Sequence, residues 1–502
     1  MANISTKSSV MAVKKEVTEG VPVVPVAGGD AIALQSDTSI EPAFDELTNE
    51  ELKASIGAAK TILGNENPTV SLSHYFRASG VEGQAPNFGE LVESFMGAVA
   101  VASTEYDTVA ASTVSVIKVD TGEGATFERG EGLLIKDPVN GYRVRCIDSI
   151  ASNDLTVGFQ VPVAPGTGVN LGKCSLYKPA NSLHPTLTAW LYLGNGGAIE
   201  AVSGARVTSM NVDANAGEFI NANYSLEGLA AYFNPITTTA TTIYVDFTDD
   251  TGTYAAVVAA KTWKDPHQLA AAIQAAMQGL TAETITVVYS DSTGKFTIAS
   301  STSAVLSLLW NTGTNAANSI GTKIGFLVAA NDTGATTYTS DNAQSYAFPF
   351  TASFDAADPN VGKNMEVMLG DTDDYVCFEA SSVSISGSNT KSTLTSLCAE
   401  SGNSGSIITE RTFEMTVTAR LSQYDADIWR RFREGSNTKL QMTMGPKSGG
   451  NWIAGKVAVA YCPTATVSSF SITDSDGLAV MEIGLKAYVN DAGEGEFYYG
   501  FL

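Results

Sequence analysis

The sequence predicts a mainly β protein in which a sandwich-like unit with one flanking helix occurs twice and two smaller domains are inserted. Three observations lead to this prediction. Apolar and polar residues alternate with period two in many short segments, and turns rich in Gly, Asp or Asn separate these segments. One order of strands and turns around a helix recurs in both halves. With 502 residues, the chain is also too long for a single core.

Charge and cysteine content narrow the class of protein. The formal net charge is -24, from 53 acidic and 29 basic residues, so binding to phosphate backbones or anionic membranes is not expected. No apolar run approaches the length of a spanning helix, and the first residues lack the apolar core of a signal peptide. We therefore expect synthesis in the cytosol and no membrane partner. The five cysteines are dispersed without a C-x-x-C pair, which predicts reduced thiols.

The second half contains the clearest strand, residues 412–421, in which apolar side chains from Phe413 onward alternate with polar ones. A helix is predicted directly after it, with Ile428, Trp429 and Phe432 as its buried stripe and Gly435 as its end. Further strands are predicted at 439–444, 456–462, 465–472 and 478–489, with a hairpin turn at 474–477.

The same order occurs in the first half, which predicts an internal duplication. A strand at 69–80 precedes a helix at 87–97, and strands at 186–197, 205–212 and 219–228 follow. Leu91 and Phe95 align with Ile428 and Phe432 at an offset of 428 − 91 = 337, whereas Leu187 aligns with Leu440 at 440 − 187 = 253. The difference of 337 − 253 = 84 residues predicts an insertion in the first copy.

Two inserted domains complete the predicted organisation. Residues 108–181 read as a small all-β domain, and residues 238–341 as an α+β domain with a helix at 265–280. The first repeated domain then comprises 1–107 and 182–237, and the second 342–502. Within the first, residues 43–60 are predicted to form a short helix or an ordered arm.

No catalytic, cofactor-binding or metal-binding residue is predicted. The three histidines, His74, His184 and His267, lack metal-ligand spacing. Ser388 and Lys391 have the spacing of a penicillin-binding nucleophile motif, but no K-T-G follows. The DSDG turn at 474–477 lacks the glutamate of a calcium loop. A carboxylate pair such as Asp373 and Asp374 leaves a glycosidase as an open alternative.

Three segments together resemble the tail tube proteins of long, non-contractile-tailed bacteriophages of the siphovirus type. They are residues 75–97, the hairpin at 205–229, and above all the ending ITDSDGLAVMEIGLKAYVNDAGEGEFYYGFL at 472–502. The resemblance covers both repeated copies, which would then be two tandem tail-tube-like β-sandwiches.

The resemblance implies a structural subunit without enzymatic activity. Its strands would join those of neighbouring subunits into a ring, and rings would stack into a tube around a tape-measure protein, bounded by tail terminator and distal tail proteins. DNA would pass through the lumen without specific binding during ejection. The implied location is the virion tail, with the host cytoplasm as the site of assembly. Because two copies occupy one chain, a homotrimeric ring with pseudo-six-fold symmetry is favoured over a homohexamer. A distal tail or baseplate protein, or a surface adhesin, stays an alternative.

The end of the chain is unusually apolar. We predict that its last residues either close the chain's own core or contact a neighbouring subunit; both options stay open. These residues are Phe497, Tyr498, Tyr499, Phe501 and Leu502.

Overall fold

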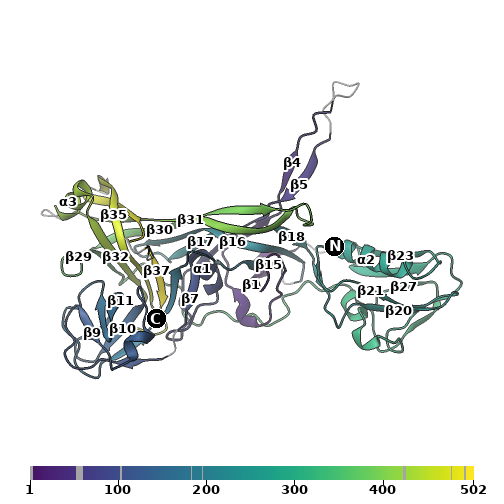
Figure 1. The fold of residues 1–502 in the computed structure, drawn as a ribbon, viewed down its shortest axis with the longest axis horizontal. Helices are drawn as coiled ribbons and strands as arrows, with labels where there is room; N and C mark the ends of the chain where they lie inside the picture. The colour runs from purple at the N-terminus through teal and green to yellow at the C-terminus, as the bar shows by residue number, and fades with distance from the viewer. Residues whose placement is uncertain are drawn as a thin grey trace. The chain divides into compact units, whose positions relative to one another are not determined.

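The computed structural model describes residues 4–51, 60–101, 104–182, 184–194, 196–421, 426–475, 477–490, 493 and 495–502. The chain divides into two compact units (Figure 1). The smaller comprises Met1–Met11, Ala189–Ser203 and Ala230–Thr351, and the larger comprises Ala12–Thr188, Gly204–Leu229 and Ala352–Leu502. Strands dominate both units, so the predicted mainly β class is confirmed. The finer division into four domains stays a prediction.

The α-helices of the described residues are α1 (Gly89–Met96), α2 (Pro266–Gln278) and α3 (Asp427–Glu434). Strands β1 (Val10–Lys15), β15 (Leu187–Leu193) and β16 (Ala198–Asn215) contribute to both units. The other strands of the smaller unit are β18 (Ala230–Phe233), β19 (Ile236–Thr237), β20 (Tyr244–Thr248), β21 (Thr253–Val257), β22 (Thr262–Trp263), β23 (Ile285–Ser290), β24 (Lys295–Ser300), β25 (Leu306–Leu308), β26 (Asp332–Ala335) and β27 (Thr337–Thr339). Those of the larger unit up to β17 are β2 (Ala31–Ile32), β3 (Ser39–Glu41), β4 (Phe44–Leu47), β5 (Ile62–Glu66), β6 (Thr69–Tyr75), β7 (Gly97–Ala100), β8 (Tyr106–Asp107), β9 (Val116–Lys118), β10 (Gly132–Asp137), β11 (Gly141–Ala151), β12 (Asp154–Val157), β13 (Asn170–Lys173), β14 (Ser175–Pro179) and β17 (Asn221–Glu227). The remaining ones are β28 (Glu366–Gly370), β29 (Tyr375–Cys377), β30 (Ala380–Thr395), β31 (Asn403–Arg420), β32 (Asn437–Met444), β33 (Lys447–Ser448), β34 (Asn451–Trp452), β35 (Ala458–Ser475), β36 (Leu478–Ala487) and β37 (Tyr498–Phe501).

The smaller unit has its own core, formed by α2 and two small sheets. Asp265 caps α2 by accepting a hydrogen bond from the Gln268 amide, 2.8 Å away. Leu269, Ile273 and Met277 all turn inward, as the sequence predicts. The sheets are β21-β20-β25-β26 and β23-β24-β27.

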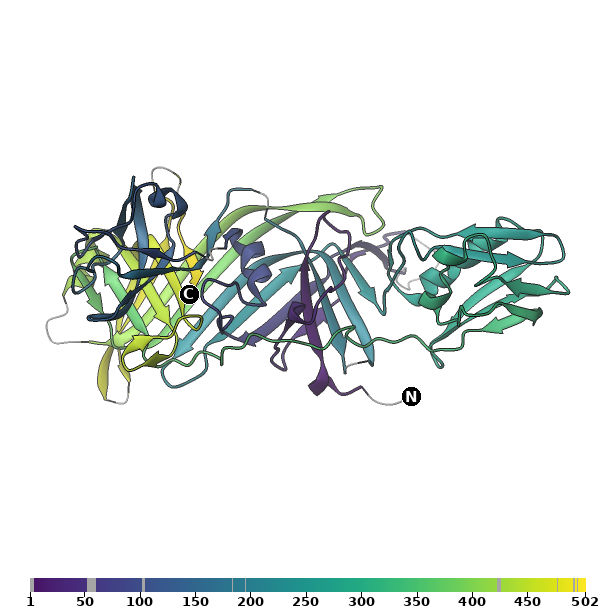
Figure 2. The ribbon, with the colours of Figure 1, turned by 90° about the horizontal axis from the view of Figure 1, so that it is seen from below.

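The larger unit contains the duplicated architecture. In the first copy, β6 pairs with β17 and β17 with β16. In the second copy, β31 pairs with β36 and β36 with β35. The strand that precedes each set pairs in the same way, β3 with β6 and β30 with β31. Figure 2 shows the purple and teal strands of the first copy beside the green and yellow strands of the second.

The registers of the two copies agree residue by residue. Ser39 pairs with Ser71 and Ser384 with Thr416, an offset of 384 − 39 = 345. The same offset relates the pair Phe44–Glu66 to Asn389–Arg411, and a β-bulge follows at the same place in both. A second bulge, after Val207 in β16, recurs after Val467 in β35, at 467 − 207 = 260. Bulges are specific local features, so their recurrence supports an internal repeat.

The two flanking helices end as predicted. Gly97 closes α1 with φ = 105° and Gly435 closes α3 with φ = 60°, conformations that glycine adopts without strain. The predicted buried stripe of α3 is wrong at Trp429, which is 50% exposed. Arg431 is buried in its place, because its guanidinium pairs with Asp427 at 2.6 Å and Asp371 at 3.0 Å.

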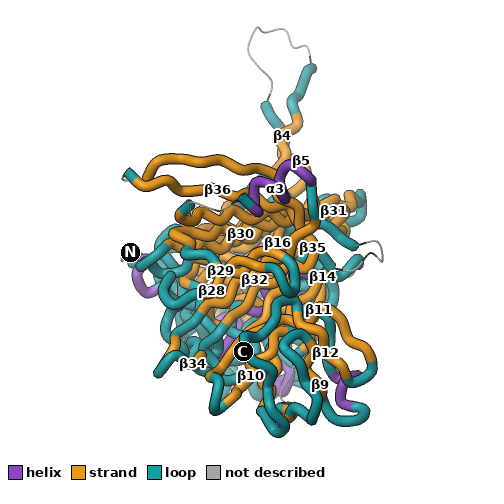
Figure 3. Tube along the Cα trace, turned by 90° about the vertical axis from the view of Figure 1, so that its left-hand side faces the viewer, coloured by secondary structure: helices purple, strands orange, loops and turns teal. Residues whose placement is uncertain are grey.

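For residues 43–60 the sequence predicts a short helix or an ordered arm, and the helix alternative is wrong at 44–47. Phe44–Leu47 is strand β4, which pairs with β5 in a hairpin; residues 52–59 of that prediction lie outside the described part of the chain. Every side chain of β4 is exposed, so no buried face selects a helix here. Figure 3 shows this hairpin standing clear of the sheet of the larger unit.

The inserted all-β segment forms the six-stranded sheet β8-β13-β10-β11-β12-β9. Its entry and exit strands, β7 and β14, pair with each other, and β14 also pairs with β37. One side of the segment encloses a separate core. The other side packs on the second copy, where Leu134, Val144 and Phe159 share a cluster with Trp452 and Tyr461.

Two further predictions concern membranes and thiols. Within the described residues no helix has the length and hydropathy needed to span a membrane. All five cysteines are free; Cys146, Cys174 and Cys462 are buried, whereas Cys377 and Cys398 are exposed.

Candidate assembly interface

One face of the duplicated sheet is polar along its whole width. Antiparallel partners point to the same side of a sheet, so the registers assign the face of every strand. The paired residues Ser71 and Ser225 continue sideways into Ser209 and Ser388. A second line of paired residues crosses the same face four residues further along β6. It runs from Tyr75 and Asn221 into Asp213, Ser384 and Thr416.

Charges on this polar face are sparse and mostly negative. Among the described strands, its carboxylates are Glu41, Asp213, Glu227, Glu410, Glu414 and Glu482, and its cations are Arg206, Arg420 and Lys486. Lys486 lies 3.9 Å from Glu414. Serine, threonine and asparagine fill most other positions, so the face offers hydroxyl and amide groups with an excess of negative charge.

The opposite face of the sheet is a hydrophobic core. Alternate residues of the same strands are buried there, among them Leu72, Val212, Ile385, Val417 and Ile483. Helix α1 packs on this side, where Phe95 meets Phe413 edge to face at 5.5 Å. The alternation therefore separates a solvated face from a core, as period two requires.

The two copies join edge to edge within the chain. Strand β16 of the first copy pairs with β30 of the second over seven consecutive residue pairs, from Ser209–Ser388 to Asn215–Ser382. The result is one layer with the order β3-β6-β17-β16-β30-β31-β36-β35.

Both outer edges of this eight-strand layer are open. Among the described strands, β3 pairs only with β6. The distal part of β35, from Ser469 to Ser475, pairs only with β36, although its counterpart in β16 is paired on both sides. Strand edges with free N–H and C=O groups are sites for pairing with another chain.

The apolar end of the chain lies in the chain's own core. Strand β37 pairs with β35 on one side and with β14 on the other. Phe497 stacks on Phe413 at 4.5 Å, and Phe501 contacts Phe88 edge to face at 5.7 Å. The end residues Phe497, Tyr498, Tyr499, Phe501 and Leu502 are each at most 5% exposed. Just before them, Glu496 accepts a hydrogen bond from the Arg411 guanidinium at 2.6 Å.

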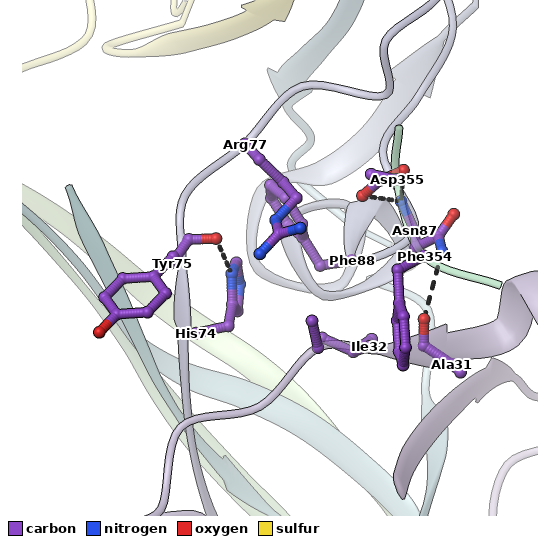
Figure 4. Close-up of a pocket in the computed structure, with 10 residues that line it drawn as sticks. Ala31, Ile32, His74, Tyr75, Arg77, Asn87, Phe88, Phe354 and Asp355 are labelled. Atoms are coloured by element: carbon purple, nitrogen blue, oxygen red, sulfur yellow. Dashed lines mark hydrogen bonds between the residues drawn. The ribbon is translucent and has the colours of Figure 1, made fainter. Parts of the chain in front are cut away.

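Two titratable groups with shifted pKa values, His74 and Asp355, line a small cavity beside α1 (Figure 4). Burial lowers the pKa of His74 to about 4, and Nε2 of this ring has no partner among the described residues. Burial also raises the pKa of Asp355 to about 6, although both of its oxygens accept from the Asn87 amide. The cavity volume of about 10 Å³ holds one water molecule at most, so it is no substrate pocket.

The other candidate chemical groups are not brought together into a site. His184 and His267 lie in different units; the former bonds to backbone carbonyls and the latter to Asp291. Asp374 accompanies Arg431 at 3.9 Å. Within the described ranges, no three or more His, Cys, Asp and Glu side chains gather in a metal-binding arrangement.

The sequence did not indicate two parts of this interface. Strand β3 is only three residues long and offers no alternation to detect. In β30, Ser382, Ser384, Ser386 and Ser388 alternate with only two large apolar residues, Val383 and Ile385, which is too short an apolar pattern to stand out in the sequence. The internal repeat could have indicated β3, because Ile40 and Val70 are separated by the same number of residues as Ile385 and Met415.

No family model matches the chain, and the comparison with curated proteins found no match. Solved structures give partial similarities. The SPP1 tail tube is 15% identical over 29% of this chain and 80% of its own, with a TM-score of 0.20. The baseplate of the anti-feeding prophage is 10% identical over 26% of this chain and 91% of that one, with a TM-score of 0.21. An Hcp protein is 9% identical over 26% and 95%, with a TM-score of 0.17.

Proposed function

We propose that this chain is the structural subunit of a bacteriophage tail tube, in which each ring closes by pairing the two open edges of the eight-strand layer. The observation that carries the proposal is the β16–β30 junction. This junction joins the two copies within one chain and leaves the equivalent edges unpaired at both ends of the layer. Head-to-tail pairing of such edges is a heterologous contact that closes into a ring.

The repeat fixes the register of the contact between chains. In the intrachain junction, Asp213 lies opposite Ser384. The offset of 260 converts Asp213 to Thr473, and the offset of 345 converts Ser384 to Ser39. Thr473 of one chain should therefore pair with Ser39 of the next, and Ser471 with Glu41.

Three chains in each ring fit the size of a tube that passes duplex DNA. Three copies of the eight-strand layer give 24 strands. Spaced about 4.8 Å apart and tilted by about 40°, these strands close with a radius of about 24 Å. The duplication makes such a trimer pseudo-six-fold, which favours it over a ring of six chains.

The polar face would line the lumen. Hydroxyl and amide groups with a net excess of carboxylates, such as Asp213 and Glu482, repel phosphate and offer few fixed cations to hold it. DNA could then slide during ejection, after the lumen has released a tape-measure protein. Stacked copies of the ring, tail terminator and distal tail proteins are the other proposed partners, in the virion and, during assembly, in the host cytoplasm.

The position of the all-β insert supports this orientation. It packs on strands of the second copy through Trp452 and Tyr461, on the side away from the polar face. An insert in the lumen would block DNA, whereas one on the outside would not.

A disulfide across the proposed contact tests the function. The variant Ser39→Cys/Thr473→Cys, with exposed Cys377 and Cys398 replaced by serine, is assembled and oxidised. We expect covalent dimers and trimers, since paired strands bring Cα atoms within disulfide range, and cryo-electron microscopy should show three chains in each ring.

The matched control is Ser39→Cys/Ser225→Cys, because Ser225 lies on the same polar face but on an inner strand. It should form no covalent oligomers. Six chains in each ring, or no tubes or rings from the unmodified protein, would contradict the proposal.

A further inference from the structure

We infer that the β4–β5 hairpin of one chain docks on the second copy of the next chain in the same ring, with Glu46 beside Lys486 and Phe44 against Phe432. This inference rests on the proposed function, because it requires the ring, but it concerns a surface outside the paired edges. The partner is a second copy of this chain.

The internal repeat provides a docked example of the same hairpin. The distal half of the β30–β31 hairpin corresponds to β4–β5 at the offset of 345, bulge included. This distal half lies against the first copy of its own chain. The Asn389 amide donates to the carbonyls of Phe95 and Val207 at 3.0 and 3.1 Å.

An ion pair anchors the docked hairpin. Lys391 donates to the Gly228 carbonyl at 3.2 Å and lies 3.6 Å from the Glu227 carboxylate. The Lys391 side chain is only 4% exposed. The Glu227 side chain is 50% exposed, so the buried member of the pair is the lysine, whose charge needs a nearby carboxylate.

The equivalent positions carry the same pair with the charges exchanged. Lys391 corresponds to Glu46 at the offset of 345. Glu227 corresponds to Lys486, because Glu227 faces Thr69 in the first copy as Lys486 faces Glu414 in the second. Glu46 is exposed, and the Lys486 side chain is 56% exposed. Charge complementarity is thus preserved although both residues differ.

Beside the ion pair, an aromatic side chain of the β4–β5 hairpin replaces a polar one of the docked hairpin, whose Asn389 amide donates to backbone carbonyls. Asn389 corresponds to Phe44, and Phe95, which Asn389 contacts, corresponds to Phe432 at the offset of 337. Phe95 is fully buried beneath β30, where Gly387 lies against its ring. Phe432 is only partly buried and its neighbour Trp429 is 50% exposed.

The hairpin itself has the matching exposed surface. Phe44, Leu47, Ile62 and Leu63 are between 42% and 62% exposed, and Figure 3 shows the hairpin projecting from the sheet. An exposed apolar patch of this kind indicates a protein contact, and in the proposed ring the partly exposed aromatic side chains of α3 in the next chain would meet it.

Charge reversal provides the first test. In unmodified tubes the pair is attractive, so Glu46→Lys and Lys486→Glu should each raise the protein concentration needed for tube formation by about tenfold. The double variant Glu46→Lys/Lys486→Glu should need a lower concentration than either single variant, although the carboxylate introduced at position 486 would still oppose Glu414 within its own chain. The matched control is the double variant Lys391→Glu/Glu227→Lys, which exchanges the charges of the intrachain pair. It should form tubes at the same protein concentration as the unmodified chain. If the Glu46→Lys/Lys486→Glu double variant assembles no better than the single ones, the inference is wrong.

Cross-linking gives the partner and its position. The variant Glu46→Cys/Lys486→Cys, in the Cys377→Ser/Cys398→Ser chain, is assembled and treated with a short bis-maleimide. We expect a ladder that stops at the trimer, because contacts within a ring close on themselves. Species longer than the trimer would mean docking on a neighbouring ring and would overturn the inference. The inference is also wrong if tubes of the Glu46→Cys/Lys486→Cys variant give no cross-linked product while tubes of the Ser39→Cys/Thr473→Cys variant do. That result would leave the proposed function intact.

Discussion

His74 lies between two aromatic rings, and no carboxylate is among the groups that act on its pKa; its Nδ1 lies 3.0 Å from the Tyr75 carbonyl. Its ring centroid is 4.4 Å from that of Phe88 and 5.5 Å from that of Tyr224. The nearest cation that acts on it, Arg77, disfavours protonation further. The neutral imidazole is therefore part of the folded core.

This arrangement predicts a pH-dependent stability. The pKa of His74 falls from 6.5 in the unfolded chain to about 4 in the fold. The neutral His74 ring contributes fully to the free energy of unfolding above pH 6.5. This contribution is lost as the pH falls to about 4, because only the unfolded chain takes up the proton in that range. The loss is about 3 kcal/mol of unfolding free energy.

The measurement is urea unfolding between pH 7.5 and 4, compared with His74→Phe, which keeps an aromatic ring between Phe88 and Tyr224. The variant should lose less stability than the unmodified chain over this range, and above pH 6.5 both slopes should agree. Equal slopes at all pH values would show that His74 is protonated in the fold or accessible to solvent.

At the scale of elements, the strand at 412–421 and both flanking helices were predictable because large apolar residues mark their buried faces. Strand β30 was not, because Val383 and Ile385 are its only large buried side chains among serines. The exposure of Trp429 could not be predicted either. Helix α3 has only eight residues, and its sequence does not show which of its apolar side chains face the sheet.

The last strand provides an element-scale prediction. Deleting residues 497–502 removes β37 from between β35 and β14 and opens the core around Phe413 and Phe88. The cost should exceed the whole stability of a typical domain, since one buried Phe→Ala change alone costs about 3–5 kcal/mol. We expect no folded chain by circular dichroism.

The point variant Phe501→Ala separates this effect from assembly. It should fold with a lowered melting temperature. A truncated chain that folds but does not polymerise would instead assign these residues to a contact between subunits.

At the scale of the whole molecule, the proposed lumen leads to a prediction about the passage of DNA. Ser384→Lys/Thr416→Lys places two cations side by side on the polar face, which gives six in each three-chain ring. Ejection from phage carrying this variant should slow and should recover as salt is raised, because phosphate binding releases counterions.

The control places the same two cations elsewhere. Val139→Lys/Val163→Lys changes exposed positions on the all-β insert and should leave the ejection rate unchanged. If this control slows ejection as much, the insert rather than the polar face meets the DNA.

The β16–β30 junction has a kinetic consequence. A ring of six separate copies has six contacts between chains. With two copies in one chain, half of these contacts form within a chain, at an effective concentration that does not depend on the protein concentration in the cell. Nucleation of the proposed ring then depends on about the third power of protein concentration instead of the sixth. Because the junction lies within one chain, the edges of β16 and β30 are paired before any partner is met. The proposed ring could then start at a low protein concentration.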